Sequence, residues 1–318
     1  LVSRVLVTRR PPGRALEMLE TVHEVDVWDG DGEMPHDELL DRLPGAEGLY
    51  CMLTDRIDAA VVGTPGLRVV SQMAVGVDNV DLDAIRAAGI PLGHTPDVLT
   101  DATADLAVAL LLAGARRLAE GIEHVKADAW GPWEPDLLLG VDVSGSTVGI
   151  VGLGRIGEAV ARRMTGFGCR LLVSSRTPKP DLEAELGVER VSFEVLLARA
   201  DHVVLTVPLS DETRGMVDAT ALARMQPSAG LVNIARGPNV ETDALVAALG
   251  ADAIAYAALD VTVPEPIGSD HPLVADPRCT VIPHLGSSTL GTRAAMAELA
   301  AENLLAGLAG GPMPARIA

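Results

Sequence analysis

Aromatic residues are scarce in this 318-residue chain: three Trp, two Tyr and two Phe make up 2% of it. Hydrophobic residues nevertheless account for 48% and charged residues for 22%, so the chain can fill globular cores. Those cores must be built mainly from Ala, Val and Leu. The length predicts two ordinary domains rather than one small core.

Basic residues are also few, since 25 Lys and Arg stand against 44 Asp and Glu and the net charge is −19. Such an acidic surface argues against nucleic acid or an anionic membrane as a partner. It also means that an anionic cofactor or substrate needs local positive groups. We therefore expect a binding site to be marked by individual arginines or lysines.

The chain has only three cysteines, Cys51, Cys169 and Cys279, which lie far apart and show no metal-ligand spacing. This pattern is typical of a reducing compartment, with the thiols buried as small apolar groups. The longest strongly apolar stretch, residues 106–115, falls well short of the roughly 18 residues of a membrane span. The sequence thus predicts a cytoplasmic protein with no metal site and no membrane contact.

Apolar β-branched runs alternate with helical patterns along most of the chain, which is typical of parallel sheets covered by helices. The predicted strands of the first section are residues 5–8, 24–28, 48–51, 67–71 and 91–94, and its helices are residues 15–21, 36–43 and 82–88. The predicted strands of a second series are residues 147–151, 170–174, 202–206, 230–233, 253–259 and 280–282. A long helix over residues 101–119, capped by Thr100 or Asp101, joins the two series, and residues 290–308 form a last helix.

The strongest single motif is the run VGIVGLGRIG at residues 148–157, which follows a strand pattern and opens a helix pattern. Gly152 permits the tight turn, Gly154 lets the backbone approach a pyrophosphate, and Gly157 lets the helix pack close to the sheet. The N–H groups at the helix start then face the phosphates. This context predicts a dinucleotide site; the alternative is a tight turn with nothing bound.

The end of the second strand of this series distinguishes between the two nicotinamide dinucleotides. NAD sites usually place an acid there for the ribose 2′-OH, but this chain has Ser175, Arg176 and Thr177, and its first acid is Asp181. An arginine flanked by hydroxyls suits a 2′-phosphate through charge-assisted hydrogen bonds. NADP(H) is therefore favoured and NAD(H) remains possible; the alternative is a solvated turn whose arginine contacts nothing.

Three polar residues follow successive later strands: Arg236 in the run NIARG, Glu265 between two prolines, and His284 after Pro283. The carboxyl ends of parallel strands line the ligand crevice of an α/β sheet, so these side chains are expected to meet at one edge. Each alone is more simply a surface arginine, a loop carboxylate and a capped histidine. Their order behind a dinucleotide motif instead indicates catalysis.

Taken together, these motifs closely resemble those of the D-isomer-specific 2-hydroxyacid dehydrogenase family, and within it the glyoxylate/hydroxypyruvate reductases. The resemblance covers nearly the whole chain and its motifs are highly specific in combination. Beyond the glycine motif it rests on residues 71–81 (SQMAVGVDNVD), 102–105 (ATAD), 207–209 (VPL), 233–237 (NIARG), 265–266 (EP) and 283–284 (PH). The run SRTPKP at residues 175–180 is particularly similar to the NADPH-using glyoxylate reductase branch.

The resemblance implies two doubly wound α/β domains. Residues 1–99 with 288–318 would form a flavodoxin-like substrate-binding domain, and residues 100–287 a Rossmann dinucleotide-binding domain. It also implies a homodimer in which residues 103–143 reach across to the partner. Trp133 matches a tryptophan that enters the partner's substrate pocket in the reductase branch; simple dimer packing is the equal alternative.

The implied reaction is the NADPH-dependent reduction of glyoxylate or hydroxypyruvate to glycolate or D-glycerate. His284 would act as the acid, Glu265 would orient its ring, and Arg236 would bind the 2-oxo oxygen and the carboxylate. Asp260 would receive the carboxamide or orient Arg236. Further substrate contacts are expected from the N–H groups of Val75 and Gly76 and, more weakly, from Leu53. The expected cofactor contacts outside the three glycines and the Arg176 turn are Thr103, Leu153, Arg155, Ile156, Val207, Pro208, Thr213, Ile234, Ala235, Asp260, His284 and Gly286.

Two alternatives stay open from the sequence. The first is a member of the same family that acts on another acid, such as 3-phosphoglycerate, formate or phosphite; a phosphorylated substrate would require more basic residues than Arg56 and Arg68 near the first domain's strand ends. The second is a dinucleotide-sensing scaffold, which the complete Arg236, Glu265 and His284 set does not exclude. The chain lacks a disordered or basic extension of the kind expected of such a scaffold.

Overall fold

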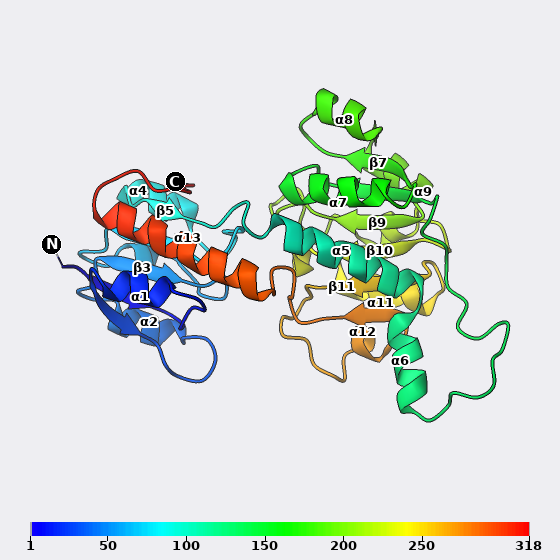
Figure 1. Cartoon of the computed structure of the whole chain (residues 1–318), viewed down its shortest axis with the longest axis horizontal. Helices are drawn as coiled ribbons and strands as arrows, with labels where there is room; N and C mark the ends of the chain where they lie inside the picture. The colour runs from blue at the N-terminus through cyan, green and yellow to red at the C-terminus, as the bar shows by residue number, and fades with distance from the viewer. Residues whose placement is uncertain (1, 318) are drawn as a thin grey trace. The chain divides into compact units, whose positions relative to one another are not determined.

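A computed structural model describes residues 2–317 (Figure 1). The chain divides into two compact units: unit 1 is formed by the residues up to Leu99 together with those from Ser287 onward, and unit 2 is Thr100–Gly286. Among the residues described, no helix is long and apolar enough to cross a membrane.

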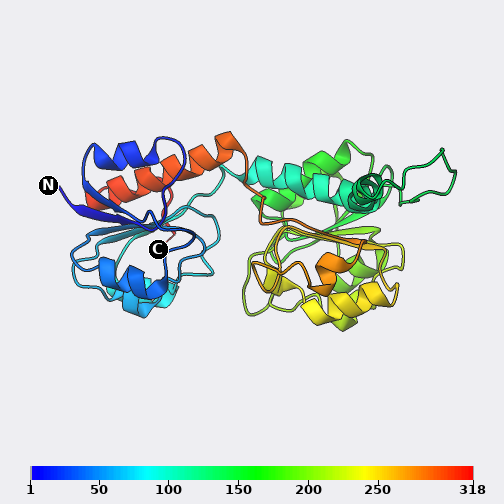
Figure 2. The same cartoon turned by 90° about the horizontal axis from the view of Figure 1, so that it is seen from below.

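Unit 1 is built on a five-stranded parallel sheet with the strand order β2-β1-β3-β4-β5. Its strands are β1 (Arg4–Val7), β2 (Glu24–Val27), β3 (Gly48–Cys51), β4 (Val69–Gln72) and β5 (Leu92–Gly93). Its helices are α1 (Ala15–Glu20), α2 (His36–Arg42), α3 (Ala59–Val62), α4 (Leu82–Ala88) and α13 (Leu290–Leu308). Figure 2 shows α1 and α13 on one face of this sheet and helices of the first section on the other. The order of the strands reverses at β1 and β3, as in doubly wound folds.

The last helix of the chain is an integral part of this unit. Tyr50 on β3 donates a hydrogen bond to the carbonyl of Ala297 on α13 (3.1 Å). Ser71 on β4 likewise donates to the carbonyl of Ala300 (2.7 Å). The side chains concerned are buried, so both bonds satisfy groups that water does not reach. The two ends of the chain are thereby joined in one core.

Unit 2 contains a seven-stranded parallel sheet with the order β12-β11-β10-β9-β6-β7-β8. Its strands are β6 (Thr147–Val151), β7 (Arg170–Ser174), β8 (Glu189–Arg190), β9 (His202–Leu205), β10 (Gly230–Asn233), β11 (Tyr256–Leu259) and β12 (Cys279–Val281). Its α-helices are α5 (Thr100–Ala115), α6 (Leu118–Lys126), α7 (Arg155–Thr165), α8 (Pro180–Leu186), α9 (Phe193–Arg199), α10 (Ala219–Leu222), α11 (Thr242–Gly250) and α12 (Pro272–Ala275). Helices α5 and α7 pack side by side on one face, and α11 lies on the other (Figure 2). The strand order reverses at β6 and β9, and sheets of this kind bind ligands at the carboxyl ends of the two strands beside such a reversal.

One of the few aromatic residues organises the middle of unit 2. The ring of Tyr256 fills a space left by two glycines, because a Cβ on Gly114 or Gly230 would come within 2.2 or 2.0 Å of it. Its hydroxyl lies 3.0 Å from Nδ1 of His202 and donates to the carbonyl of Leu111 on α5 (3.3 Å). Both side chains are buried, and these bonds join the long helix to the sheet.

The two-domain parallel α/β class predicted from the sequence is confirmed, with local corrections. The predicted helix over residues 101–119 ends at Ala115, where Arg117 takes a left-handed backbone (φ 51°) and a second helix begins. Thr100 and Asp101 lie in the first turn of α5 and are not its cap. The strand predicted over residues 253–259 begins only at Tyr256, after the turn at Asp252 (φ 53°). Cys169 is half-buried, whereas Cys51 and Cys279 are buried.

Candidate active site

The three predicted catalytic residues follow three neighbouring strands. Arg236 comes after β10, Glu265 after β11 and His284 after β12, and these strands are adjacent and parallel. Nδ1 of His284 lies 2.6 Å from Oε1 of Glu265, within hydrogen-bond and ion-pair distance. The sequence therefore places the residues at one edge of the sheet, and the structure pairs two of them directly.

The charge of Glu265 is stabilised despite partial burial. Desolvation acts to raise the pKa of this carboxyl, but the hydrogen bond and charge of His284 oppose it, helped by the N–H of Thr262 and the charge of Arg236. The net result is a pKa below the ordinary value for glutamate. Glu265 is thus a carboxylate near neutral pH and can accept a hydrogen bond from the ring of His284.

His284 is held in an uncommon backbone conformation. Its φ is +52°, a left-handed value that residues other than glycine rarely adopt. Its N–H donates to the carbonyls of Asp260 (2.9 Å) and Ile282 (3.1 Å). Sparsely populated conformations of this kind persist where surrounding contacts determine them, often at functional sites.

Asp260 provides those surrounding contacts. Its carboxylate accepts the N–H of Leu285 and the N–H of Gly286 (2.9 Å), the two residues after His284. Only 2% of Asp260 is exposed, and burial raises its pKa against the lowering effect of these bonds. The sequence left two roles open for Asp260, the carboxamide or Arg236. The structure adds a third, which is to anchor the turn that carries the histidine.

Two asparagine side chains hold the turn that carries Arg236. Asn233 accepts the N–H of Ala235 (3.0 Å) and donates to the carbonyl of Arg236 (2.9 Å). Asn239 accepts the N–H of Arg236 (3.0 Å). Gly237 packs so closely on Thr262 that a Cβ would lie 2.0 Å from its carbonyl oxygen. Neither asparagine was predicted from the sequence to have a role, although asparagine beside a turn is a recognised signal for side-chain to backbone bonds.

The glycine motif has the geometry of a dinucleotide turn. Gly152 has φ +98°, and a Cβ on it would lie 2.9 Å from Cγ1 of Val207. A Cβ on Gly157 would lie 2.0 Å from the carbonyl oxygen of Gly152. A Cβ on Gly154 would meet nothing within 4 Å, so this face of the turn is open. Helix α7 begins directly after Gly154 with no side-chain cap, which leaves its first N–H groups for a phosphate. These residues fit a dinucleotide.

The other residues predicted to contact the cofactor lie around this turn or beside His284. Thr206, directly after β9, donates to the carbonyls of Val151 and Gly152 (3.0 and 2.6 Å), and Val207 lies next to Gly152. Thr103 on α5 lies beside Gly286, whose Cβ would be 3.4 Å from its methyl group. Of the remaining ones, Leu153, Ile234 and Ala235 are buried, Ile156 and Thr213 are half-buried, and Arg155 is exposed.

The turn predicted to contact a 2′-phosphate lies at the surface after β7. Arg176 is 80% exposed on its side chain, and its Nη1 lies 3.5 Å from Oε2 of Glu212. Ser175 donates to the carbonyl of Thr177 (3.1 Å), which closes the turn. The side chain of Arg176 is thus mostly solvated, with the exposed carboxylate of Glu212 as its neighbour.

The substrate residues predicted in unit 1 lie on two loops after β3 and β4. The carbonyl of Val75 lies 3.1 Å from Nδ1 of His94, and the carbonyl of Gly76 accepts a hydrogen bond from Gln72 (2.5 Å). Leu53 lies in the loop after β3, next to Met52. The N–H of Met52 donates to the carboxylate of Asp55 (2.6 Å). These contacts hold the two loops by their backbones.

Trp133 lies in the segment after α6, which projects from the rest of unit 2 (Figure 1). Its exposed fraction is 85%, and Trp130 nearby is 72% exposed. Side chains of this size are rarely left in water without a partner.

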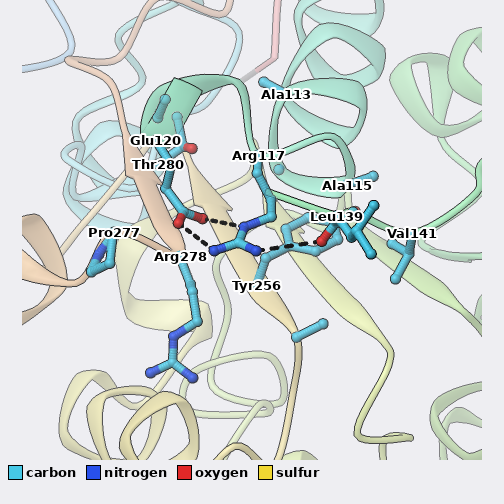
Figure 3. Close-up of a pocket in the computed structure, with 14 residues that line it drawn as sticks. Ala113, Ala115, Arg117, Glu120, Leu139, Val141, Tyr256, Pro277, Arg278 and Thr280 are labelled. Atoms are coloured by element: carbon cyan, nitrogen blue, oxygen red, sulfur yellow. Dashed lines mark hydrogen bonds and ion pairs between the residues drawn. The ribbon is translucent and has the colours of Figure 1, made fainter. Parts of the chain in front are cut away.

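A separate pocket of unit 2 contains none of the predicted site residues. It lies at the amino-terminal ends of β11 and β12 and has a volume of about 200 Å³. Figure 3 shows Arg117 facing Glu120 within it. The two form a bidentate ion pair, in which Nε and Nη2 of Arg117 donate to Oε1 and Oε2 of Glu120 at 2.8 and 2.6 Å. Arg278 extends away from that pair and bonds to Asp276 and Asp252. The charged groups of this pocket are satisfied by the protein itself, on the edge opposite Arg236 and His284.

Comparison with known proteins gives a family match and close relatives. The model of the D-isomer specific 2-hydroxyacid dehydrogenase, NAD binding domain, matches residues 108–286. The human glyoxylate reductase/hydroxypyruvate reductase is 46% identical over 321 residues, which cover 99% of this chain and 98% of that protein.

Solved structures agree with these matches. A Thermus thermophilus protein is similar with a TM-score of 0.93 and 48% identity, over 99% of this chain and all of the other. An NADPH-dependent glyoxylate/hydroxypyruvate reductase from Sinorhizobium meliloti, in complex with NADP and malonate, has a TM-score of 0.86 and 30% identity, over 100% of this chain and 97% of its own.

Proposed function

Because the chain belongs to the D-isomer specific 2-hydroxyacid dehydrogenase family of oxidoreductases, we propose that it reduces glyoxylate and hydroxypyruvate to glycolate and D-glycerate with NADPH. The observation that carries this proposal is the 2.6 Å pair of His284 and Glu265, after strands of the same sheet that bears the glycine turn. The named activities of the human and Sinorhizobium meliloti relatives support the choice of substrates.

His284 acts as the proton donor in this proposal. The reduced dinucleotide would be held at the turn of Gly152, Gly154 and Gly157 and would supply the hydride. His284 would donate a proton to the substrate oxygen as that oxygen becomes negative. Glu265 contacts Nδ1 of His284, so Nε2 is the nitrogen that faces the substrate and delivers the proton. In the oxidative direction the same nitrogen accepts the proton.

Arg236 anchors the substrate. Its planar guanidinium can bind the carboxylate and the 2-oxo oxygen together, and its charge stabilises the oxygen as it becomes negative. Asparagine side chains bond both the N–H and the carbonyl of Arg236. These bonds fix the backbone from which the guanidinium extends. The further substrate contacts of the proposal are the N–H groups of Val75 and Gly76, the side chain of Leu53, and Trp133.

The proposed cofactor site uses the open face of the glycine turn for the pyrophosphate. Arg176, with Ser175 and Thr177, binds the 2′-phosphate of NADPH in place of Glu212, because a phosphate offers more charge and more acceptors than one exposed carboxylate. The other proposed contacts are Thr103, Leu153, Arg155, Ile156, Val207, Pro208, Thr213, Ile234, Ala235, Asp260, His284 and Gly286.

The test is to follow the absorbance of the reduced nicotinamide with glyoxylate and with hydroxypyruvate, using NADPH and NADH in parallel. We expect turnover of both acids and a lower KM for NADPH than for NADH. In Arg176→Ala the KM for NADPH should rise about 10-fold or more, because a charge-assisted phosphate contact of about 1.5–3 kcal/mol is lost. The KM for NADH should change little.

The matched control is Arg190→Ala. Arg190 is another exposed arginine, and it lies on the edge strand β8, which pairs with β7, the strand before Arg176. No turnover of either acid, despite measurable dinucleotide binding, would overturn the proposed substrates and direct attention to other 2-oxo acids and phosphite. Turnover with NADH alone would keep the reaction and remove the proposed role of Arg176.

We also propose that the chain forms a homodimer through residues 103–143. Leu118, Ile122 and Val125 lie on one face of α6 at helical spacing and are 52%, 56% and 54% exposed. Light scattering should give twice the chain mass of 33.0 kDa. Ile122→Glu should shift the mass toward the monomer, whereas Val22→Glu, at an exposed valine of unit 1, should not. A monomeric wild-type protein would refute this proposal.

A further inference from the structure

Asn239 is a completely buried asparagine whose amide connects two parts of unit 2. Its Oδ1 accepts the N–H of Arg236 (3.0 Å), and its Nδ2 donates to the carbonyl of Thr213 (3.0 Å). The orientation of the amide is determined by its partners, because an N–H requires an acceptor and a carbonyl requires a donor. One side chain therefore bonds both the turn that carries Arg236 and the segment after β9.

That segment, residues 206–216, is here called the cofactor loop. It begins beside the glycine turn, since a Cβ on Gly152 would lie 2.9 Å from Val207. Within the loop, the hydroxyl of Thr213 donates a hydrogen bond to the carbonyl of Pro208 (2.6 Å). A displacement of Pro208 that moves Thr213 therefore also moves the carbonyl of Thr213. That carbonyl accepts the hydrogen bond from Asn239.

Backbone bonds run parallel to the amide. The N–H of Gly215 donates to the carbonyl of Pro238 (2.8 Å), and the N–H of Val217 donates to the carbonyl of Asn239 (3.1 Å). They fix the cofactor loop to the chain after Arg236. The Asn239 amide is the side-chain bond that reaches the N–H of Arg236 itself.

We propose that Asn239 is a positioning residue that couples dinucleotide binding at the cofactor loop to the orientation of Arg236, and so to binding of the 2-oxo acid. The inference rests on the proposed function, in which Arg236 is the substrate anchor. Reciprocal coupling between two ligands requires a physical element that both of them bias. Here that element is the pair of bonds made by one amide.

Two substitutions separate this coupling from a local role. Asn239→Asp has nearly the same shape and keeps an acceptor for the N–H of Arg236, but at about pH 8 its second oxygen is an acceptor facing the Thr213 carbonyl. Asn239→Leu removes both bonds and keeps the volume. A role confined to the Arg236 turn would leave the aspartate variant close to wild type, whereas the coupling should be lost in both variants.

The experiment measures binding of oxamate, an unreactive analogue with a carboxylate next to a carbonyl, by titration with and without saturating NADP. In the wild type we expect NADP to tighten oxamate binding by a factor within about 5–150. In both variants this factor should fall toward 1, while the Kd for NADP alone changes less than about 3-fold. The KM for glyoxylate should rise about 10-fold, since a small misplacement of an anchoring group has effects of this size or larger.

A protonation test makes the aspartate variant its own rescue. At about pH 5.5 a buried aspartate, whose pKa is raised by desolvation, regains an O–H that can donate to Thr213. The NADP-dependent tightening should therefore return in Asn239→Asp at low pH and not in Asn239→Leu. Asn303→Leu, which removes a buried asparagine with the same two kinds of backbone partner in unit 1, gives the stability cost alone.

The two failures are distinguishable. A wild-type protein that does not reduce glyoxylate refutes the proposed function, whatever the variants do. A wild-type protein that turns over, with Asn239→Asp retaining the NADP-dependent tightening at about pH 8, refutes the coupling and leaves the reaction intact. Equal loss of oxamate binding with and without NADP would also refute it, because that result indicates a local role.

Discussion

Replacing His284 by asparagine is expected to lower kcat for glyoxylate reduction by about 10²–10⁴-fold, the usual contribution of a positioned general acid. Asparagine is the informative substitution because it tolerates the left-handed backbone (φ +52°) better than alanine does. The turn held by Asp260 should therefore persist, and the loss can be assigned to the imidazole. The measurement is kcat with NADPH at saturating glyoxylate, together with the Kd for NADPH, which should change little.

Glu265→Gln provides the companion variant. Glutamine keeps an oxygen for the ring nitrogen but removes the charge of the hydrogen-bond partner. We therefore expect kcat for glyoxylate reduction to fall in this variant, by less than in His284→Asn, because the ring is still present but is held less firmly. An asparagine at position 284 that retained more than about a tenth of wild-type kcat would refute the acid role, because this is far less than the loss expected for a general acid.

Gly157→Ala is expected to abolish dinucleotide binding and to destabilise unit 2 by about 3 kcal/mol or more. Its Cβ would lie 2.0 Å from the carbonyl oxygen of Gly152 and 2.8 Å from Oγ1 of Thr206. The first of these is a backbone atom of the turn, so α7 must move away from β6 to accept a methyl group. The measurements are the Kd for NADPH and the unfolding transition of the variant.

Gly154→Ala is the matched comparison, because it adds the same methyl group to the same turn at a position with open space around it. Nothing lies within 4 Å of that Cβ, and its φ of −76° suits an L-residue. The variant should unfold like the wild type yet bind NADPH more weakly, since the methyl group occupies the face where the pyrophosphate approaches. Unchanged NADPH binding in Gly154→Ala would place the pyrophosphate elsewhere.

Much of the fold was predictable because its signals are local. The apolar runs of β3, β6, β7 and β10 begin and end at the residues predicted for them, since strands buried on both faces read as continuous apolar segments. The break between α5 and α6 was not predicted. Residues 101–119 have helical composition throughout, and the left-handed Arg117 is held by its ion pair with Glu120 and its bond to Leu139. The second of these comes from a segment that sequence patterns do not place beside α5.

The candidate site divides in the same way. The glycine turn and the order of Arg236, Glu265 and His284 were readable because each follows a strand end, and parallel strands bring such ends to one edge. The role of Asp260 was not readable, because its carboxylate bonds to N–H groups 25 and 26 residues later. The same holds for Asn239, whose second partner is Thr213, 26 residues earlier.

The sequence by itself thus determined the α/β class and the glycine turn, and it singled out the three residues that we propose as acid, partner and anchor. Periodicity, glycine spacing and strand-end residues are properties of short segments, so they can be recognised in the sequence without knowledge of the fold. Only the tertiary structure decided which buried side chains hold those groups in place. A buried carboxylate or amide is satisfied by whatever backbone the fold brings within about 3 Å of it, and that neighbour is set by packing between distant segments.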